Sequence, residues 1–565
     1  MTKQALIECV PNFSEGRDLS IIKQITNEIE SVEGVKLLDV DPGAATNRTV
    51  VTFVGTPGPV TEAAFRAIKK AAELIDMSKH KGEHPRMGAT DVCPLIPIAN
   101  ISMEETAKWA HSLGKKVGDD LSIPVFMYEY AATREERRNL ATVRSGEYEG
   151  LPKKFSRPEW APDYGPARFN AGTGATAIGA RDFLVAYNVN LNTTSVRRAN
   201  SVAFDVREKG RAKRTGNPIT GPIERDEAGQ PLRIPGACKS VKAIGWYIEE
   251  YKMAQISMNL TNIKVTPLHV AFEACRKSAA DRGLRVTGSE LVGLVPLEVM
   301  LSAGRYFLQK QRRSVGVSEA ELIRIAVRSL GLDELSPFDP QKKIIEYQLR
   351  AQESRPLLDM SLPAFADETA SESPAPGGGS ISAYVGALGI SLATMVANLS
   401  AHKRSWDHRW EEFSEWAERG QLLKNALLQL VDEDTKAFNG ILIAFRLPKG
   451  TEQEKLARQE AIQAATRQAI DIPFQVVKLA YQSFETIKAM AETGNPNSVT
   501  DAGVGALCAR AAVRGAFLNV KVNVADLKDK DYVAEVISKG EEYLRLAEER
   551  EKEVMELVDR QLMKS

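Results

Sequence analysis

Apolar residues follow two different patterns along the chain, and the first extends to about residue 190. Short apolar or β-branched runs there alternate with segments in which apolar residues recur every three to four positions. This alternation predicts strands and helices in an α/β layer structure. We expect strands at 5–10, 35–40, 49–54, 92–97, 125–130 and 183–190, and helices at 60–76 and 104–113.

A similar pattern begins at Val241 and predicts a second α/β subdomain that closes near Phe338. We expect its strands at 244–247 and 254–260 and its helix at 267–282. Between the two patterns, residues 210–236 are rich in glycine, proline and charge. This composition predicts a connecting segment with an exposed loop at 215–229.

After Pro340 the strand signals almost vanish and helical periodicity continues to the C-terminus. We expect helices at 422–445, 452–469, 474–493 and 532–563, with breaks at Pro448, Pro473 and Pro496. The predicted fold class is therefore an α/β N-terminal region of two subdomains followed by an all-α helical bundle. The expected boundaries are 1–190, 191–340, a linker at 341–360, and 361–565.

A charge-free segment runs from Pro374 to Ala401, and its part from Ile381 is long enough to cross a bilayer. The segment is rich in glycine, serine and alanine and has modest hydrophobicity. A helix buried in a soluble bundle fits this composition better than a membrane span.

The composition of the 565 residues is that of a soluble globular protein, with 43% hydrophobic and 26% charged residues. Basic and acidic residues number 74 each, which excludes a polybasic nucleic-acid binder. The five cysteines lack CxxC spacing and indicate a reduced set, and no export signal is recognised at the start of the chain. We therefore expect a cytoplasmic protein that binds neither nucleic acid nor membranes.

The densest group of chemically active side chains lies at 76–88. His80-x-x-Glu83-His84 matches a zinc-peptidase pattern, which requires a continuous helix to bring both imidazoles to one face. Gly82 within the pattern and Pro85 directly after it predict a loop instead, so zinc is not expected. Histidine suits proton transfer and Arg86 suits a carboxylate substrate, although a solvated polar loop would have the same composition.

Two glycine clusters allow more than one interpretation. Residues 172–179 lack dinucleotide-binding spacing and precede the strand at 183–190, so a tight turn or close approach to a ligand is expected. Residues 376–380, Pro-Gly-Gly-Gly-Ser, precede a long apolar helix. Amides at such a helix start can hold anionic or carbonyl oxygens, and a closely packed turn would use the same residues.

Asp434 lies in a predicted helix near one face with Phe438 and Ile441. Burial on that face would raise its pKa and suit proton transfer, whereas a solvated acidic face is the alternative. Trp406, Trp410 and Phe413 have helical spacing and are expected in the core or at a subunit interface.

Long motifs throughout the chain resemble the formimidoyltransferase-cyclodeaminase family. In the transferase part they are ECVPNFSEG at 8–16, LDVD at 38–41, TNRT at 46–49, KGEHPRMG at 81–88, WAPDYGP at 160–166, GATA at 174–177, IGWY at 244–247 and GSELVGLVP at 288–296. APGGGS at 375–380 and VDED at 431–434 resemble the cyclodeaminase part. The resemblance covers nearly the whole chain in the family's order.

The resemblance implies specific roles for individual residues. His84 would be the catalytic histidine of the transferase, Asp41 its active-site partner, and Asp434 the acid/base of the deaminase. The implied folate-binding residues are Gly165, Pro166, Phe169, Gly172 and Gly174 in the first site and Gly377, Gly378, Gly379 and Ser380 in the second. Arg48 and Arg86 are candidates for the substrate carboxylates on chemical grounds. Residues 168–173 differ from the animal pattern, which weakens the transfer of folate contacts there.

The family's activity would be transfer of a formimino group from N-formimino-L-glutamate to tetrahydrofolate, followed by cyclisation to 5,10-methenyltetrahydrofolate with release of ammonia. The resemblance implies folate between two α/β subdomains, tetrahydrofolate as a co-substrate with or without a polyglutamate tail, no metal, and a homo-oligomer with dimerising domains. Two alternatives stay open for the helical domain: a methenyltetrahydrofolate cyclohydrolase, or a non-catalytic folate-binding and oligomerisation scaffold.

Overall fold

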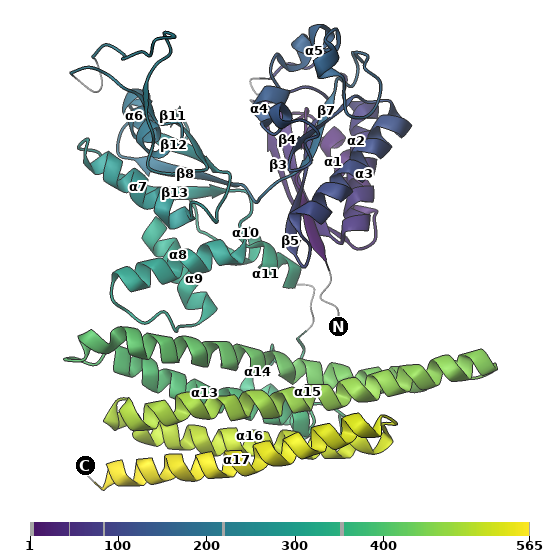
Figure 1. Ribbon diagram of the computed structural model, residues 1–565, viewed down its shortest axis with the longest axis vertical. Helices are drawn as coiled ribbons and strands as arrows, with labels where there is room; N and C mark the ends of the chain where they lie inside the picture. The colour runs from purple at the N-terminus through teal and green to yellow at the C-terminus, as the bar shows by residue number, and fades with distance from the viewer. Residues whose placement is uncertain (1–4, 45, 83–84, 217–220, 351–354, 564–565) are drawn as a thin grey trace. The chain divides into compact units, whose positions relative to one another are not determined.

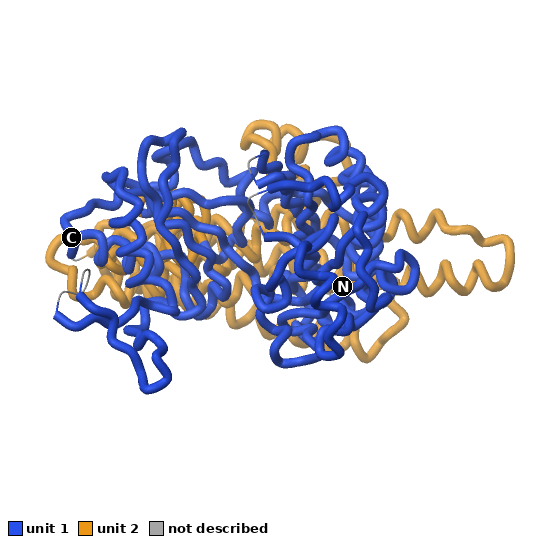
Figure 2. The backbone as a smooth tube through the Cα atoms, turned by 90° about the horizontal axis from the view of Figure 1, so that it is seen from above, with its two compact units in different colours: residues 1–299, 330–349 blue, residues 300–329, 350–565 orange. Residues whose placement is uncertain are grey.

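A computed structural model describes residues 5–44, 46–82, 85–216, 221–350 and 355–563, without the side chain of Arg350. The chain forms two compact units, which Figure 2 distinguishes by colour. Unit 1 consists of the residues up to 299 together with 330–349. Unit 2 consists of 300–329 together with 350–565.

Unit 1 begins with a seven-stranded mixed sheet. Its strands are β1 (Leu6–Cys9), β2 (Asn12–Phe13), β3 (Val35–Gly43), β4 (Arg48–Gly55), β5 (Thr90–Ala99), β6 (Val125–Glu129) and β7 (Thr176–Ala180). Strands β1 and β2 both lie between β4 and β5, and β3 forms the edge beyond β4. Strand β7 pairs in parallel with β5 and β6, and the other pairings are antiparallel.

Alternating side chains of this sheet contribute to two separate cores. Cys93, Met127 and Ile178 pack in a cluster with residues of the helices α1 (Leu19–Glu30), α2 (Pro57–Leu74) and α3 (Met103–Leu121). The three helices lie together beside the sheet (Figure 1). Phe126 and Ala177, which point the other way, pack in a smaller cluster. That cluster includes residues of α4 (Leu140–Val143) and α5 (Glu147–Phe155), and the short helices η1 (Glu135–Arg137) and η2 (Pro158–Trp160) lie in the same stretch.

The second sheet of unit 1 is antiparallel and has the order β11-β12-β8-β13. Its strands are β8 (Val185–Leu191), β11 (Val241–Ile248), β12 (Met253–Leu260) and β13 (Val286–Val292), with helices α6 (Val196–Val206) and α7 (Leu268–Ala280). Val241, Ala243 and Gly245 are the buried positions of β11, and the Gly245 amide donates to the side chain of Asn200 on α6 at 3.0 Å. One face of the sheet is therefore covered by helix.

The segment between these elements, 210–236, forms a hairpin based on β9 (Arg211–Ala212) and β10 (Arg233–Ile234). Most described residues of the expected loop at 215–229 are exposed, and 217–220 lie outside the described residues. Unit 1 ends with the short helices α10 (Pro340–Lys343) and α11 (Ile345–Arg350).

Unit 2 is helical in its described residues. The helices are α8 (Leu297–Lys310, whose start belongs to unit 1), α9 (Glu319–Leu330), α12 (Leu362–Thr369), α13 (Gly378–Ala401), α14 (Trp410–Phe445), α15 (Glu452–Thr493), α16 (Val499–Asn523) and α17 (Lys530–Leu562). Single 3-10 turns η3 (Asp407–Arg409), η4 (Pro496–Ser498) and η5 (Val524–Asp526) lie between them. Together with unit 1, this arrangement confirms the predicted fold class.

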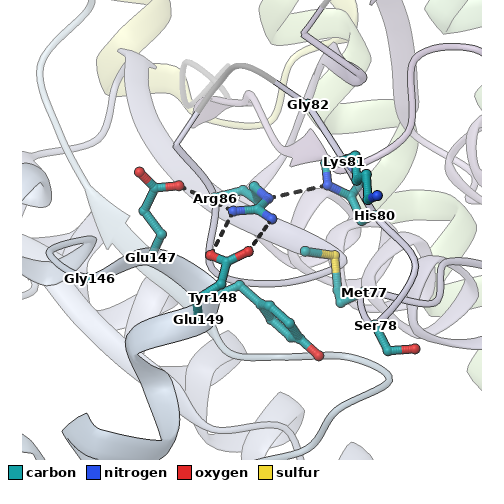
Figure 3. Close-up of a pocket in the computed structure, with 10 residues that line it drawn as sticks. All are labelled: Met77, Ser78, His80, Lys81, Gly82, Arg86, Gly146, Glu147, Tyr148 and Glu149. Atoms are coloured by element: carbon teal, nitrogen blue, oxygen red, sulfur yellow. Dashed lines mark hydrogen bonds and ion pairs between the residues drawn. The ribbon is translucent and has the colours of Figure 1, made fainter.

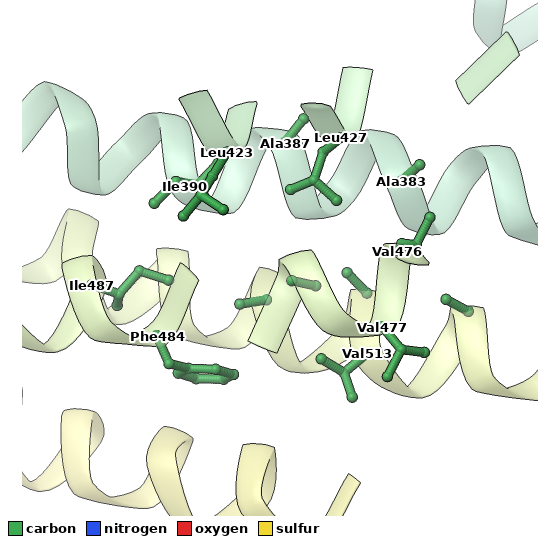
Figure 4. Packing of buried hydrophobic residues seen from close by; sticks show 14 of the residues in the cluster. Ala383, Ala387, Ile390, Leu423, Leu427, Val476, Val477, Phe484, Ile487 and Val513 are labelled. Carbon is green, nitrogen blue, oxygen red and sulfur yellow. The ribbon is translucent and has the colours of Figure 1, made fainter. Parts of the chain in front are cut away.

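Helix α13 lies within the bundle, where Ala383, Ala387 and Ile390 pack in one core with Leu427 of α14 and Val513 of α16 (Figure 4). Its small residues let neighbouring helices approach closely: a Cβ at Gly389 would stand 2.9 Å from the Gly505 carbonyl oxygen. Among the described helices, α13 is long and apolar enough to cross a membrane, and 61% of its most apolar window is buried inside the bundle.

Three expectations about elements need correction. The break expected at Pro473 is wrong, because α15 continues through this buried proline. The helix expected to start at residue 422 begins at Trp410, so Trp410 and Phe413 belong to it, whereas Trp406 precedes η3. Phe413 is fully buried and stacks on Trp406 at 5.5 Å between ring centroids. The glycine cluster does not all precede a strand, because Gly179 lies inside β7.

Candidate active sites

A pocket of about 740 Å³ lies in the first subdomain of unit 1 (Figure 3). Two segments of the chain line it, the loop after α2 and the start of α5. The lining residues are Met77, Ser78, His80, Lys81, Gly82, Arg86, Gly146, Glu147, Tyr148 and Glu149. The sequence predicted chemistry at the first of these segments and missed the second.

Contacts with the β3–β4 turn hold the loop at residues 77–82. His80 Nε2 lies 2.9 Å from the Asn47 carbonyl oxygen, and Asn47 Nδ2 donates to the Lys81 carbonyl at 3.2 Å. A Cβ at Gly82 would overlap the Thr46 carbonyl, so only glycine fits there. The described residues of the motif are not helical, which confirms the predicted loop; Glu83 and His84 lie outside the described residues. No cluster of three potential metal ligands occurs among the residues described.

Arg86 connects the two sides of the pocket. Its guanidinium donates to Glu149 at 2.6 and 2.9 Å, to Glu147 at 3.2 Å and to His80 Nδ1 at 3.2 Å (Figure 3). The hydrogen bond to Glu149 raises the pKa of Arg86, and the same bond lowers the pKa of Glu149. A substrate carboxylate at Arg86 would therefore replace one of these glutamates. The acidic sequence Glu147-Tyr148-Glu149 was the feature of the chain that could have indicated ion-pair partners for Arg86.

Part of the predicted folate segment lies next to the pocket lining. The Met77 amide donates to the Gly172 carbonyl at 2.8 Å, and the Phe169 ring packs against Tyr148 with 5.4 Å between centroids. Gly174, at φ +67°, lies so close to Gly88 that a Cβ on it would overlap the Met87 carbonyl. These contacts place Phe169 and Gly172 against residues that line the pocket, whereas Gly174 contacts the residues directly after Arg86.

Gly165 and Pro166 have other surroundings. Gly165 has φ +79°, and a Cβ there would overlap the Ile123 carbonyl just after α3. The preceding Asp163 forms a buried ion pair with Arg137, 2.7 Å long, and accepts the Met127 amide at 2.7 Å. The WAPD motif thus anchors the chain to β6, and neither residue is among those that line the pocket.

Arg48 and Asp41 lie on neighbouring strands. Arg48 of β4 donates to Asn12 Oδ1, and burial lowers the pKa of its guanidinium to about 10. Asp41 is exposed on β3 opposite Val50. Burial, with a smaller effect of the Asp41 charge, raises the pKa of the nearby Asp39. Neither Arg48 nor Asp41 is among the residues that line the pocket.

A second constellation lies in unit 2, where the first turn of α13 meets α14. Ser380 is fully buried, and its Oγ lies 3.1 Å from Asp434 Oδ2 and 2.8 Å from the Val431 carbonyl. A Cβ at Gly379 would stand only 2.5 Å from Asp434 Cγ. Desolvation raises the pKa of Asp434, although hydrogen bonds from the Ser380 hydroxyl and amide oppose the shift. The glycine-rich turn and the predicted acid/base residue are therefore in contact.

The neighbouring Asp432 has a structural role. It is buried and accepts the backbone amides of Leu357 and Leu358 at 3.0 and 3.3 Å. The two aspartates of the motif thus face different surroundings, and only Asp434 lies beside the turn at 377–380.

The chain thus has a polar pocket in an α/β unit and a half-buried carboxylate in a helical bundle, which are two separate candidate sites of an enzyme. Three family models match it in order: the formiminotransferase domain, N-terminal subdomain, at residues 6–181, the formiminotransferase domain at 186–350, and formiminotransferase-cyclodeaminase at 361–542. The chain belongs to the formimidoyltransferase-cyclodeaminase family.

Three curated relatives illustrate how the similarity is distributed. Formimidoyltransferase-cyclodeaminase of Mus musculus is 43% identical, and the match covers 93% of each chain. Glutamate formimidoyltransferase of Streptococcus pyogenes serotype M1 is 41% identical over 54% of this chain and 93% of its own length. Methenyltetrahydrofolate cyclohydrolase of Methylorubrum extorquens is 35% identical over 31% of this chain and 84% of its own.

Proposed function

We propose that this chain transfers the formimino group of N-formimino-L-glutamate to tetrahydrofolate and then cyclises 5-formiminotetrahydrofolate to 5,10-methenyltetrahydrofolate with release of ammonia. The observation that carries the proposal is the similarity to bifunctional relatives along 93% of the chain. The contact between Asp434 and the turn at 377–380 supports a second acid–base site in unit 2. We assign transfer to subdomains 1–190 and 191–340 and cyclisation to 361–565, with 341–360 as the linker.

Transfer requires a base for N5 of tetrahydrofolate and an acid for the departing glutamate nitrogen. His84 removes the N5 proton as N5 attacks the amidine carbon, and it then protonates the glutamate nitrogen. Asp41 orients His84 and stabilises its imidazolium form. Arg48 and Arg86 bind the carboxylates of glutamate, and the segment containing Gly165, Pro166, Phe169, Gly172 and Gly174 binds the folate.

Cyclisation forms a bond between N10 and the same carbon and breaks the bond to the amino nitrogen. Asp434 accepts the proton from N10 and delivers it to that nitrogen, which leaves as ammonia. A carboxyl group with a raised pKa suits this exchange, because it can hold the proton between the two steps. Gly377, Gly378, Gly379 and Ser380 bind the folate beside it.

In metabolic terms, the chain links histidine degradation to one-carbon metabolism as a transferase and an ammonia lyase. We place it in the cytoplasm as a homo-oligomer with dimerising domains that uses tetrahydrofolate or its polyglutamates as co-substrate. Both steps consist of proton transfers and bond exchange at one carbon, which require no metal. The similarity to a cyclohydrolase makes hydrolysis of methenyltetrahydrofolate the alternative activity of the helical domain.

One pair of variants tests both assignments. Each variant is incubated with formiminoglutamate and tetrahydrofolate, and two products are measured: ammonia, and 5,10-methenyltetrahydrofolate by its absorbance. His84→Ala should abolish transfer and leave cyclisation of supplied 5-formiminotetrahydrofolate intact, and Asp434→Ala should do the reverse. If His84→Ala still transferred the formimino group, the assignment of His84 as the catalytic acid/base would be wrong. Absence of ammonia release from the unmodified protein would favour the cyclohydrolase alternative.

A further inference from the structure

The end of α16 brings a carboxamide to the first turn of α13. A Cβ built on Gly378 would stand 3.0 Å from Asn519 Nδ2 and 3.4 Å from its Oδ1. Asn519 lies in α16, far from Gly378 in the sequence, so no local pattern could have paired the two residues. Its side chain is half-buried.

Asn519 and Asp434 border the same turn from neighbouring positions. Gly378 faces Asn519 and Gly379 faces Asp434, and successive residues of a helix point about 100° apart. Around the adjacent Gly377, a Cβ would meet no atom within 4 Å. The carboxylate and the carboxamide therefore flank a turn whose Gly377 side is open.

The hydrogen bonds orient the carboxamide. Asn519 Nδ2 donates to the Gly515 carbonyl at 2.9 Å. Because a carbonyl oxygen only accepts, the nitrogen must face Gly515 and the oxygen must point elsewhere. Within the described part of the chain, Asn519 Oδ1 makes no hydrogen bond. An acceptor that is free of partners among the described residues thus lies at Gly378, next to the residue that contacts Asp434.

We propose that Asn519 Oδ1 accepts a hydrogen bond from the amino group of the formimino substituent, which makes it a substrate-specificity residue for cyclisation. This role rests on the proposed function. When N10 bonds to the amidine carbon, its proton passes to Asp434 and then to the amino nitrogen, and the carbon–nitrogen bond breaks to release ammonia. Asn519 holds that nitrogen beside Asp434 during the exchange.

The same contact discriminates between related folates. The formimino group presents N–H donors to Asn519 Oδ1, whereas the formyl group of 5-formyltetrahydrofolate presents an oxygen that only accepts. Two acceptors placed together leave the protein oxygen unpaired, so the formyl compound should bind less well.

The test compares cyclisation of 5-formiminotetrahydrofolate with inhibition by 5-formyltetrahydrofolate in the full chain. Asn519→Ala should lower kcat/KM by about 10- to 100-fold, the effect of one hydrogen bond to a charged group. Its inhibition constant for the formyl compound should stay equal or fall. Asn519→Asp keeps an acceptor but loses the donor to the Gly515 carbonyl, so it should cyclise more slowly than the parent while retaining the preference for the formimino compound.

Asn523→Ala is the matched control, because Asn523 lies one turn further on α16 and donates to the Ala469 carbonyl at 2.7 Å. It should cyclise normally, and transfer in unit 1 should be normal in every variant. Normal cyclisation by Asn519→Ala, or an equal loss of affinity for both folates, would overturn the role of Asn519 alone. Failure of the unmodified protein to release ammonia would overturn the proposed function and, with it, this role.

Discussion

Asp432 and Asp434 show how two identical residues in one helical turn acquire different properties. Asp432 is 4% exposed and receives two backbone amides, which compensate its burial. Asp434 is partly buried, and desolvation outweighs the hydrogen bonds from Ser380, so its pKa is raised. The burial that raises the pKa of Asp434 therefore lowers the free energy of unfolding when this carboxyl group is ionised.

Replacement of Asp434 by asparagine should stabilise unit 2 at neutral pH. A raised pKa in the folded state means that ionisation disfavours folding, so this penalty is complete above the folded pKa and vanishes below the unfolded value of about 3.9. The melting temperature of Asp434→Asn should exceed that of the parent at pH 7.5, and the difference should shrink as the pH falls toward 4. If the difference in melting temperature between Asp434→Asn and the parent were the same at every pH, the raised pKa of Asp434 would be contradicted.

At the scale of elements, the contact between α13 and α14 depends on the absence of a side chain at Gly379. The Asp434 carboxyl group occupies the space that a Cβ would need, and Ser380 on the next position holds that carboxyl group. The position of the proposed acid/base residue is therefore determined by two helices rather than by its own helix alone.

Gly379→Ala should consequently displace Asp434 and lower the rate of cyclisation by about 100-fold, since a misplacement of about 1 Å has effects of that order. Gly440→Ala on α14 is the control, because its Cβ would meet no atom within 4 Å. It should keep full activity and gain about 1 kcal/mol of helix stability. Rates of ammonia release and thermal melts of both variants provide the comparison; equal activities would show that Asp434 tolerates the added methyl group.

The sequence patterns predicted the elements with strong periodicity and missed those whose burial is decided by neighbours. Helix α16 is rich in small residues and is contacted on several sides, so its apolar residues form no single stripe. Proline disfavours a helix interior by about 3 kcal/mol, yet Pro473 is buried within the 42 residues of α15, where packing against other helices outweighs that preference.

The candidate sites follow the same rule. Asp434 and the turn at 377–380 could be named from motifs, because each is local in sequence. The pairing of Arg86 with Glu147 and Glu149, 61 and 63 residues away, and the approach of Asn519 to Gly378 depend on tertiary structure. Contacts between residues so far apart in the sequence cannot be predicted from local sequence patterns.

At the scale of the whole molecule, the chain enters unit 2 at residue 300, returns to unit 1 at 330 and enters unit 2 again at 350. Within unit 2 the first passage is bonded to the long helices. The Val315 amide donates to Ser414 Oγ at 3.0 Å, and the Gly316 carbonyl accepts from Asn398 at 2.8 Å and from Gln421 at 3.2 Å. The helical unit is therefore built from two separate stretches of sequence.

A fragment of residues 351–565 should be less stable than one of residues 300–565. It lacks these three hydrogen bonds, each of about 1 kcal/mol, which predicts a melting temperature lower by roughly 6–12 °C. Calorimetry of the two fragments measures the difference. Equal melting temperatures would show that residues 300–329 contribute nothing to the bundle.

Because unit 2 is built from two separate stretches, its first stretch is synthesised before the helices that it contacts. Val315 and Ser414 are 99 positions apart, so a ribosome that adds about 5–20 residues per second exposes the second roughly 5–20 s after the first. During that interval Leu308, Val315 and Leu322 have only each other and their nearby apolar neighbours to pack against. The Val315 amide and the Gly316 carbonyl lack native partners for most of that interval, so this period is when a chaperone would have most to protect.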